Sequence, residues 1–226
     1  MDAVSIADRL AAVQRRVDEA CRRAGRSSDS VGLVAVSKTH PPERLREAYD
    51  GGHRAFGESY AQELRDKAPS LPDDVQWHYI GRLQSNKAKY IAPHAHRIHA
   101  LERRDHALAL VKRAPAPLKC LVSVNVAGEA SKGGVPASEA LAAARALDSI
   151  DGIDIVGLMT LPPQVVDPAE AAPYFLALAE LAERGRQQGL ALDELSMGMS
   201  HDFEVAIAHG ATWVRVGTAI FGPREA

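Results

Sequence analysis

Short β-rich runs alternate with helical patterns from residue 31 to the end of the chain, and this alternation most constrains the fold. Such alternation is typical of parallel βαβ units, because parallel neighbours need a crossover connection. Eight runs fit strands, and eight parallel strands can close into a barrel. We expect these strands at residues 31–37, 53–57, 76–80, 96–100, 118–125, 153–159, 193–196 and 212–216.

The segments between these runs carry helix start and stop signals. "PPERLREAYDGG" and "PASEALAAARALDSIDG" both begin on proline and end on glycine, and Pro173 marks the start of a longer helix. An extra helix is expected at residues 3–25, before the first strand. No repeat or linker divides the 226 residues, so we expect one domain over 1–226. The predicted fold is α/β, a single modified TIM (β/α)8 barrel with an extra N-terminal helix.

Charge and hydropathy argue for a small-molecule partner. The 27 basic and 29 acidic residues are well mixed, so no nucleic-acid-binding face is expected. No stretch approaches the roughly 18 apolar residues of a membrane span, and the N-terminus lacks the apolar core of a signal peptide. Cys21 and Cys120 have no metal-ligand or CxxC spacing, so we expect buried thiols in a reducing cytoplasm.

The histidines do not form a recognisable metal motif. His94, His96 and His99 have no matching set of ligands, and no HExxH sequence occurs, so we expect no metal. His78 and His99 lie near predicted strand ends, where they either line a pocket or pack in the core. The packing role is the prediction we favour.

Lys38 ends the apolar run "VGLVAVSK", at the face where barrel enzymes carry their functional groups. A lysine there can form a Schiff base, act as counter-ion to phosphate or carboxylate, or extend to solvent. The apolar strand favours the neutral, nucleophilic amine. The sequence alone leaves these uses open.

Two further strand ends have the composition of a phosphate site. Gly198, Met199 and Ser200 precede one short amphipathic segment, and Gly217 and Thr218 precede another. Glycine lets the backbone approach a dianion and hydroxyls add donors. The two turns on neighbouring strands predict an anion cradle together with Lys38.

Arg215 lies between Val214 and Val216, so strand alternation places it on the opposite face from both valines. An arginine facing the barrel interior needs a partner. That partner is either a buried acid, in a structural ion pair, or a ring nitrogen of a ligand.

The ordered set "AVSKTHP", "FGESYAQEL", "WHYIGRLQSNK", "SKGG", "GLMTL", "SMGMSHDFEVAI" and "VRVGTAIFG" resembles the pyridoxal phosphate homeostasis protein family. The resemblance covers about residues 30 to 222. It implies the barrel of the alanine racemase N-terminal domain with one bound pyridoxal 5′-phosphate.

The resemblance also implies roles for individual residues. Lys38 would form the Schiff base, and Arg215 would face the pyridine nitrogen. Lys132 would take part in cofactor handling, whereas Asn86 lies in a family loop of less defined role. The phosphate would be held by Ser200, Gly217 and Thr218 with the backbone of Gly198 and Met199.

Three positions depart from the family pattern. Ser59 stands where many members have asparagine, Arg82 replaces a frequent proline, and Gly133 replaces a frequent serine. None of them alters the lysine, the arginine or the phosphate turns. The cofactor contact at position 59 is the one that the sequence leaves open.

A cofactor ring facing an arginine keeps its nitrogen unprotonated and is a weak electron sink. A racemase would also need a second acid or base, and the chain ends at Ala226 without the second domain that supplies it in alanine racemases. We therefore expect a monomeric cytoplasmic protein that stores pyridoxal phosphate and delivers it to apo enzymes. One alternative is a racemase or related enzyme using Tyr60, Tyr79 or a histidine, and another is a cofactor-free Schiff-base aldolase.

Overall fold

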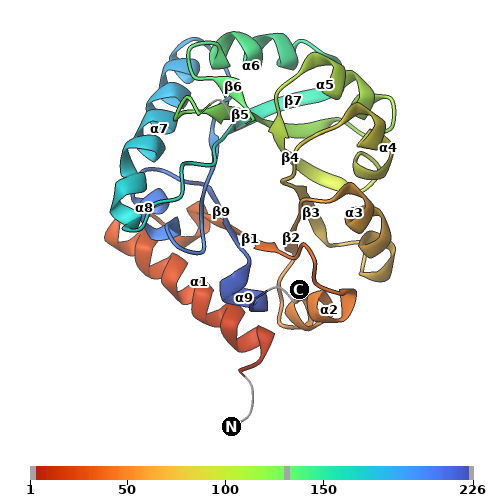
Figure 1. Ribbon diagram of the computed structural model, residues 1–226, viewed down its shortest axis with the longest axis vertical. Coiled ribbons are helices and arrows are strands. Elements are labelled where there is room, and N and C mark those ends of the chain that lie inside the picture. Colours follow the sequence, from red (N-terminus) through yellow and green to blue (C-terminus); the bar gives the residue numbers. More distant parts are fainter. Residues whose placement is uncertain (1–3, 130–132, 224–226) are drawn as a thin grey trace.

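Eight parallel strands close into a barrel in the computed structural model, which describes residues 4–129 and 133–223 (Figure 1). Pairing of β4 with β5 and of β1 with β9 completes the ring, so the predicted closed barrel is confirmed. The strands are β1 Gly32–Val36, β2 Ala55–Glu58, β3 Gln76–Tyr79, β4 Ala95–Leu101, β5 Leu118–Asn125, β7 Ile153–Met159, β8 Glu194–Met199 and β9 Trp213–Val216.

Helices surround the barrel as an outer ring (Figure 1). The α-helices are α1 Ile6–Arg23, α2 Pro42–Asp50, α3 Ala61–Lys67, α4 Ala88–Ile91, α5 Arg104–Val111, α6 Ala140–Asp148, α7 Ala172–Gln187, α8 Phe203–Ala208 and α9 Thr218–Phe221. Short 3-10 turns lie at Ser28–Ser30, Ala68–Ser70, Ser85–Lys87 and Pro168–Ala171.

The extra helix α1 begins at Ser5, whose side chain accepts a hydrogen bond from the Asp8 backbone N–H at 3.0 Å. This cap satisfies one of the N–H groups that a helix start leaves without a partner. Apolar residues at three- and four-residue spacing, such as Leu10, Val13 and Val17, are buried. They hold α1 against α2, α8 and α9.

The main apolar core lies between the strands and the helices, where Val214 and Val216 are buried. A smaller apolar cluster of Ala100, Leu121 and Met159 lies apart from it. The barrel interior also holds polar groups, because hydrogen bonds join side chains of strands that are not neighbours, such as β4 and β8. This polar interior makes the barrel suited to a ligand site.

The amino ends of the strands are filled by a charged and aromatic group. Arg97 forms an ion pair with Glu194 at 2.6 Å, and its guanidinium lies 4.9 Å from the centre of the Trp213 ring. The Trp213 indole N–H donates to Glu194 at 2.9 Å. Lys38, Ser200 and Thr218 lie at the opposite, carboxyl end, because they follow the ends of β1, β8 and β9.

Two local predictions need correction. β8 continues to Met199, three residues beyond the predicted end, so Gly198 and Met199 belong to the strand. Pro136 does not start a helix: Val135–Pro136 form the short strand β6 beside the end of β5, and α6 begins at Ala140. β6 forms here because the chain after β5 returns alongside that strand, which local helix signals do not reveal.

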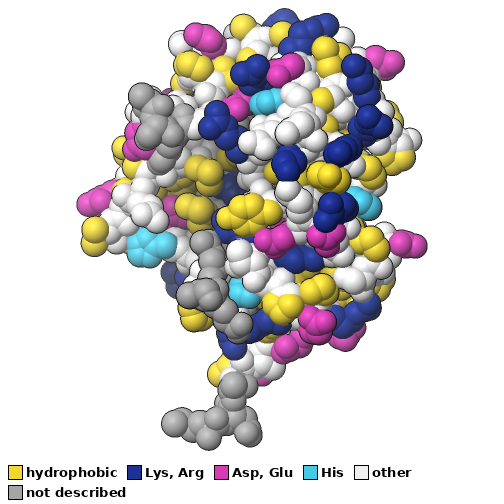
Figure 2. All heavy atoms as spheres, turned by 45° about the vertical axis from the view of Figure 1, so that its right-hand side comes forward, with side chains coloured by type: hydrophobic (Ala, Val, Ile, Leu, Met, Phe, Trp, Pro, Cys, Tyr) yellow, Lys and Arg dark blue, Asp and Glu magenta, His cyan; other side chains and the backbone are white. Residues whose placement is uncertain are grey.

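No helix among residues 4–129 and 133–223 is long and apolar enough to span a membrane. On the face shown in Figure 2, lysine and arginine side chains are interspersed with aspartate and glutamate. Cys21 and Cys120 are both buried and form no disulfide.

Candidate functional site

A cleft of about 390 Å³ opens at the carboxyl end of the barrel. Its lining comes from the ends of β1, β2, β3, β7, β8 and β9, as expected for a barrel site. The lining residues are Val36, Lys38, His40, Ser59, Ile80, Leu161, Gln164, Met199, Ser200, His201, Arg215, Gly217, Thr218 and Gly222. Six residues predicted from the sequence lie in this one cleft.

Lys38 enters the cleft directly after β1. The preceding Ser37 is fully buried, and its backbone N–H donates to the Gly57 carbonyl on β2 at 3.0 Å. The parallel pairing of β1 and β2 therefore continues to the residue before the lysine. A rigid strand thus determines where Lys38 leaves the sheet.

Arg215 projects into the barrel from β9 and is 4% exposed. Its guanidinium donates to the Ser196 hydroxyl and, at 3.0 Å, to the Thr160 carbonyl. No ion pair joins it to a carboxylate within the described part of the chain, so the buried-acid alternative is not what the structure shows. Burial lowers the pKa of Arg215 to about 10, which still leaves it charged at neutral pH.

A chain of hydrogen bonds extends from Arg215 across the barrel. Ser196 Oγ lies 2.8 Å from His99 Nδ1, and His99 Nε2 lies 2.8 Å from His78 Nδ1. Arginine can only donate, so the Ser196 hydroxyl oxygen accepts from Arg215. The same hydroxyl can donate to His99 or accept from it, so the direction of the two remaining bonds follows the tautomer of the histidines.

Both histidines of this chain are neutral. Burial lowers the pKa of His78 and of His99 well below the usual 6.5. The His78 Nε2 atom has no hydrogen-bond partner among the described residues. Neither histidine lines the cleft, so the packing role predicted for them is the one the structure shows.

The corner of the cleft beside β1 is formed by the ends of β8 and β9. Ser200 Oγ accepts from the Gly217 backbone N–H at 3.3 Å, which ties the two turns together. Thr218 begins α9, whose first N–H groups have no acceptor within the helix. This corner offers hydroxyl and backbone donors to an anion.

Gly198 supports this corner without lining the cleft. Its φ is +90°, a conformation that favours glycine, and a Cβ there would lie 2.6 Å from the Ala206 Cβ. The following Met199 N–H donates to the Asp202 carboxylate at 2.6 Å. The predicted glycine therefore serves the path of the chain between β8 and α8.

Two predicted positions lie elsewhere. Asn86 is exposed in the 3-10 turn Ser85–Lys87 and lines a separate surface hollow beside Asp105, so the structure does not bring it to the cleft. The reason is that this turn leads outward into α4. Lys132 lies outside the described residues.

Sequence reasoning did not assign several cleft residues. His40 lies two residues after Lys38 and stacks on Phe221, with ring centres 5.2 Å apart. His201 Nε2 lies 3.0 Å from the Val166 carbonyl. Both follow predicted strand ends, and this position alone could have identified them. Gln164 lies in a loop that no sequence motif marked.

The tyrosines considered as a second acid or base are poorly placed for that role. The Tyr79 hydroxyl donates to the backbone carbonyls of Ser59 and Arg82, and burial raises the pKa of Tyr79 to about 12. Tyr60 is not among the residues that line the cleft. The histidines His40 and His201 are therefore the only titratable groups in the described lining besides Lys38 and Arg215.

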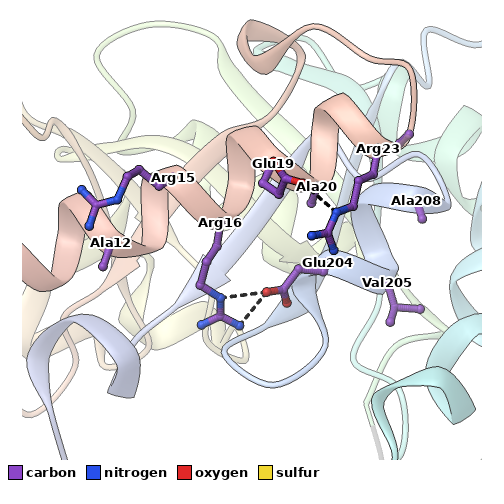
Figure 3. A pocket seen from close by; sticks show the side chains of 10 residues that line it. Ala12, Arg15, Arg16, Glu19, Ala20, Arg23, Glu204, Val205 and Ala208 are labelled. Atoms are coloured by element: carbon purple, nitrogen blue, oxygen red, sulfur yellow. Dashed lines mark hydrogen bonds and ion pairs between the residues drawn. The ribbon is translucent and has the colours of Figure 1, made fainter.

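A larger hollow of about 610 Å³ lies outside the barrel between α1 and α8 (Figure 3). Its rim carries Arg16, which pairs with Glu204 at 2.6 Å, and Arg23, which pairs with Glu19 at 2.8 Å. These arginines already have carboxylate partners. The hollow therefore has none of the chemistry that the cleft has.

Metal chemistry finds no support in the arrangement of ligands. Across residues 4–129 and 133–223, no three His, Cys, Asp or Glu side chains come together in a group that could hold a metal ion.

The comparisons agree with this geometry. The family model for the alanine racemase N-terminal domain matches residues 9–225. A pyridoxal phosphate homeostasis protein of Aquifex aeolicus is 44% identical over 223 residues, covering 96% of this chain and 98% of that protein. Its counterpart in Pseudomonas aeruginosa is also 44% identical, covering 98% of this chain and 96% of that protein.

Solved structures show the same relationship. PipY of Synechococcus elongatus has been solved without PLP, with a TM-score of 0.85 and 37% identity, over 96% of this chain and all of that one. The same protein with PLP bound gives a TM-score of 0.81 and 35% identity, with the same coverage.

Proposed function

Because this chain belongs to the pyridoxal phosphate homeostasis protein family, with the fold of the alanine racemase N-terminal domain, we propose that it binds pyridoxal 5′-phosphate (PLP) through Lys38. The observation that carries the proposal is the composition of one cleft. It joins a strand-end lysine, a buried guanidinium without a carboxylate partner in the described chain, and a corner of hydroxyl and backbone donors.

These three parts fit the three functional groups of PLP. When bound, PLP supplies an aldehyde that condenses with a primary amine, releasing one water, and a ring that accepts electrons. Lys38 is the amine in the cleft. Ser200, Gly217 and Thr218 are the donors suited to the phosphate, whereas the predicted Met199 backbone N–H already donates to Asp202. Lys132 and Asn86 are not needed for this fit.

Arg215 is suited to the ring nitrogen. It is charged at neutral pH, and its described partners, Ser196 and Thr160, are neutral. A second cation facing it would be repelled, so a ring nitrogen beside Arg215 stays unprotonated. That environment weakens the electron-accepting power of the ring and favours storage over turnover.

We therefore propose that the protein holds PLP and delivers it to apo forms of PLP-dependent enzymes, as a cytoplasmic monomer with one domain over residues 1–226. Two buried thiols without a disulfide support the reducing compartment. Light scattering during gel filtration tests the monomer, and cell fractionation tests the location. Transfer is tested by recovery of an apo enzyme's activity from loaded protein while a competing amine traps free PLP.

An absorption spectrum tests the binding proposal. Purified protein mixed with PLP is expected to gain a visible band that borohydride removes. Lys38→Ala is expected to lose the band, whereas Lys112→Ala, on a separate surface hollow, keeps it. A wild-type protein that remains colourless would contradict the proposal.

A second candidate, an amino-acid racemase, rests on His40 and His201, the titratable histidines that line the cleft with Lys38. Such an enzyme needs an acid or base besides the lysine. Incubation with single L-amino acids, followed by chiral analysis, separates the two functions. Sustained formation of D-amino acid by wild type, lost in His201→Gln, would favour the enzyme over the carrier.

A further inference from the structure

A buried ion cluster lies behind Lys38, formed by residues that do not line the cleft. The Lys67 ammonium donates to Glu58 Oε1 at 2.8 Å, to Glu63 Oε2 at 2.6 Å and to the Ser37 carbonyl at 2.9 Å. All three of its protons therefore have an acceptor. The Lys67 side chain is 6% exposed and that of Glu58 is fully buried.

The cluster holds the chain on both sides of Lys38. Before it, the Ser37 hydroxyl donates to Glu58 Oε1 at 2.7 Å, and the Ser37 carbonyl accepts from Lys67. After it, the Thr39 backbone N–H donates to Glu63 Oε2 at 2.8 Å. The cluster therefore holds both neighbours of Lys38. Ser37 bonds Glu58 and Lys67, and Thr39 bonds Glu63.

The backbone at this point is strained. Thr39 has a φ of +67°, the one positive value found for a non-glycine residue in the described chain. This conformation is costly for a β-branched residue and persists only where neighbouring contacts enforce it. The bond from Thr39 N–H to Glu63 and a turn bond from the His40 N–H to the Ser37 carbonyl, at 3.1 Å, supply that enforcement.

Stability alone does not account for such a cluster. Three charges removed from water cost free energy that their mutual attraction often fails to recover, and apolar replacements of similar size can be equally stable. Glu58 Oε2 is also buried without a hydrogen-bond partner among the described residues. A geometric requirement at Lys38 explains why charged groups occupy this position.

We propose that Lys67, Glu58 and Glu63 are positioning residues that fix the Ser37–Thr39 backbone, so that the Lys38 amine is presented to the aldehyde of the ligand. The inference rests on the proposed function, in which Lys38 bonds that aldehyde. The two carboxylates and the ammonium never touch the ligand. Their effect is on the rate at which the bond forms and on the orientation of the amine.

Glu63 offers a matched pair of variants, because its Oε2 atom makes both the Lys67 and the Thr39 contacts. Glu63→Gln keeps an oxygen that can accept both bonds, whereas Glu63→Ala removes it. The rate of visible-band growth after mixing with PLP is expected to fall at least about tenfold in Glu63→Ala and less than about threefold in Glu63→Gln. Asp66→Ala, on the exposed side of α3, is the control and is expected to match wild type.

If Glu63 only stabilised the fold, its substitution would lower the melting temperature, but the rates of band growth in Glu63→Ala and Glu63→Gln would not differ. The pH midpoint of the visible band is therefore recorded as well. This midpoint is expected to differ from the wild-type value in Glu63→Ala and to match it in Glu63→Gln. If Glu63→Ala does not fold, Ser37→Ala takes its place, with an expected slowing of about threefold. This variant removes the short hydroxyl bond to Glu58 and the longer one to the Gly57 carbonyl, and keeps the backbone bonds of Ser37.

The outcomes separate the two proposals. A wild-type protein without a band would overturn the proposed function. A normal wild-type band, together with wild-type rates and midpoints in folded Glu63→Ala or Ser37→Ala, would overturn the positioning role alone.

Discussion

The two basic side chains of the cleft, Lys38 and Arg215, are supported in different ways. Behind Lys38 lies an ionic cluster, in which Lys67 bonds Glu58 and Glu63. Behind Arg215 lies a neutral chain through Ser196 and two histidines. The ionic cluster fixes a strained backbone, whereas the neutral chain fixes the direction of a side chain.

The difference has an electrostatic consequence. The neutral chain forms no ion pair with Arg215, and among the described residues Asp202 acts on its charge only from beyond ion-pair distance, so the guanidinium remains available to a ligand. An acid in the place of Ser196 would have neutralised it. The groups behind Lys38, by contrast, bond to one another and to the backbone of Ser37 and Thr39, and they act only through that backbone.

Removing the guanidinium should have the largest effect. Arg215→Met is expected to weaken PLP binding by about 100-fold, the range for a lost hydrogen bond to a charged partner. Titration of the visible band measures the affinity. Arg97→Met removes a buried arginine at the other end of the barrel and is expected to lower stability while leaving the affinity unchanged. Equal losses of affinity in both variants would refute a ligand role for Arg215.

The ionic cluster is expected to make the free energy of unfolding depend on pH. Burial raises the pKa of Glu58 from 4.5 to about 7, although Lys67 lowers it. The fold then favours the protonated acid, so this stabilisation is complete below pH 4.5 and is lost as pH rises through 7. The loss amounts to at most about 3 kcal/mol of unfolding free energy.

Urea unfolding of wild type and Glu58→Gln at pH 5 and pH 8 measures this effect. The glutamine variant cannot titrate, so its stability is expected to fall less over this range. Parallel pH dependence in the two proteins would show that Glu58 is ionised in the fold at both pH values.

The neutral chain should give the opposite sign. The pKa of His78 is well below 6.5 in the fold, so stability from this group is present above pH 6.5 and lost as pH falls below it. The slope is about 1.4 kcal/mol per pH unit for one proton. His78→Gln, which keeps an acceptor for His99, is expected to flatten the acid limb of the unfolding curve by that amount. An acid limb that is the same in His78→Gln and wild type would mean that His78 takes up its proton in the folded protein as readily as in the unfolded chain.

Local sequence patterns predicted the two basic residues of this comparison, Lys38 and Arg215. Alternation predicted that Arg215 faces away from Val214 and Val216, which the structure buries in the outer core, and the apolar run placed Lys38 at a strand end. The fold was also predictable, because eight strands and their helices leave local signals along the chain. Gly217 and Thr218 could be placed for the same reason.

The residues that position Lys38 and Arg215 could not be predicted from local patterns in this way. The spacing of Glu63 and Lys67 predicts a helical ion pair, but a pair on a solvated face gives the same signal. Only the position of α3 beside the turn that follows β1 brings them to Ser37 and Thr39, 30 residues away for the Lys67–Ser37 pair. The position of Asn86 away from the cleft could not be predicted for a related reason, since the direction of a 3-10 turn depends on the helix that follows it.

The central claim is that Lys38 is the lysine that bonds the cofactor. Borohydride reduction of the PLP-loaded protein, followed by proteolysis and peptide mass spectrometry, tests it directly. The account predicts one modified peptide, with the phosphopyridoxyl group on Lys38. A fully labelled protein whose modification lies on Lys67, Lys87 or another lysine would contradict it.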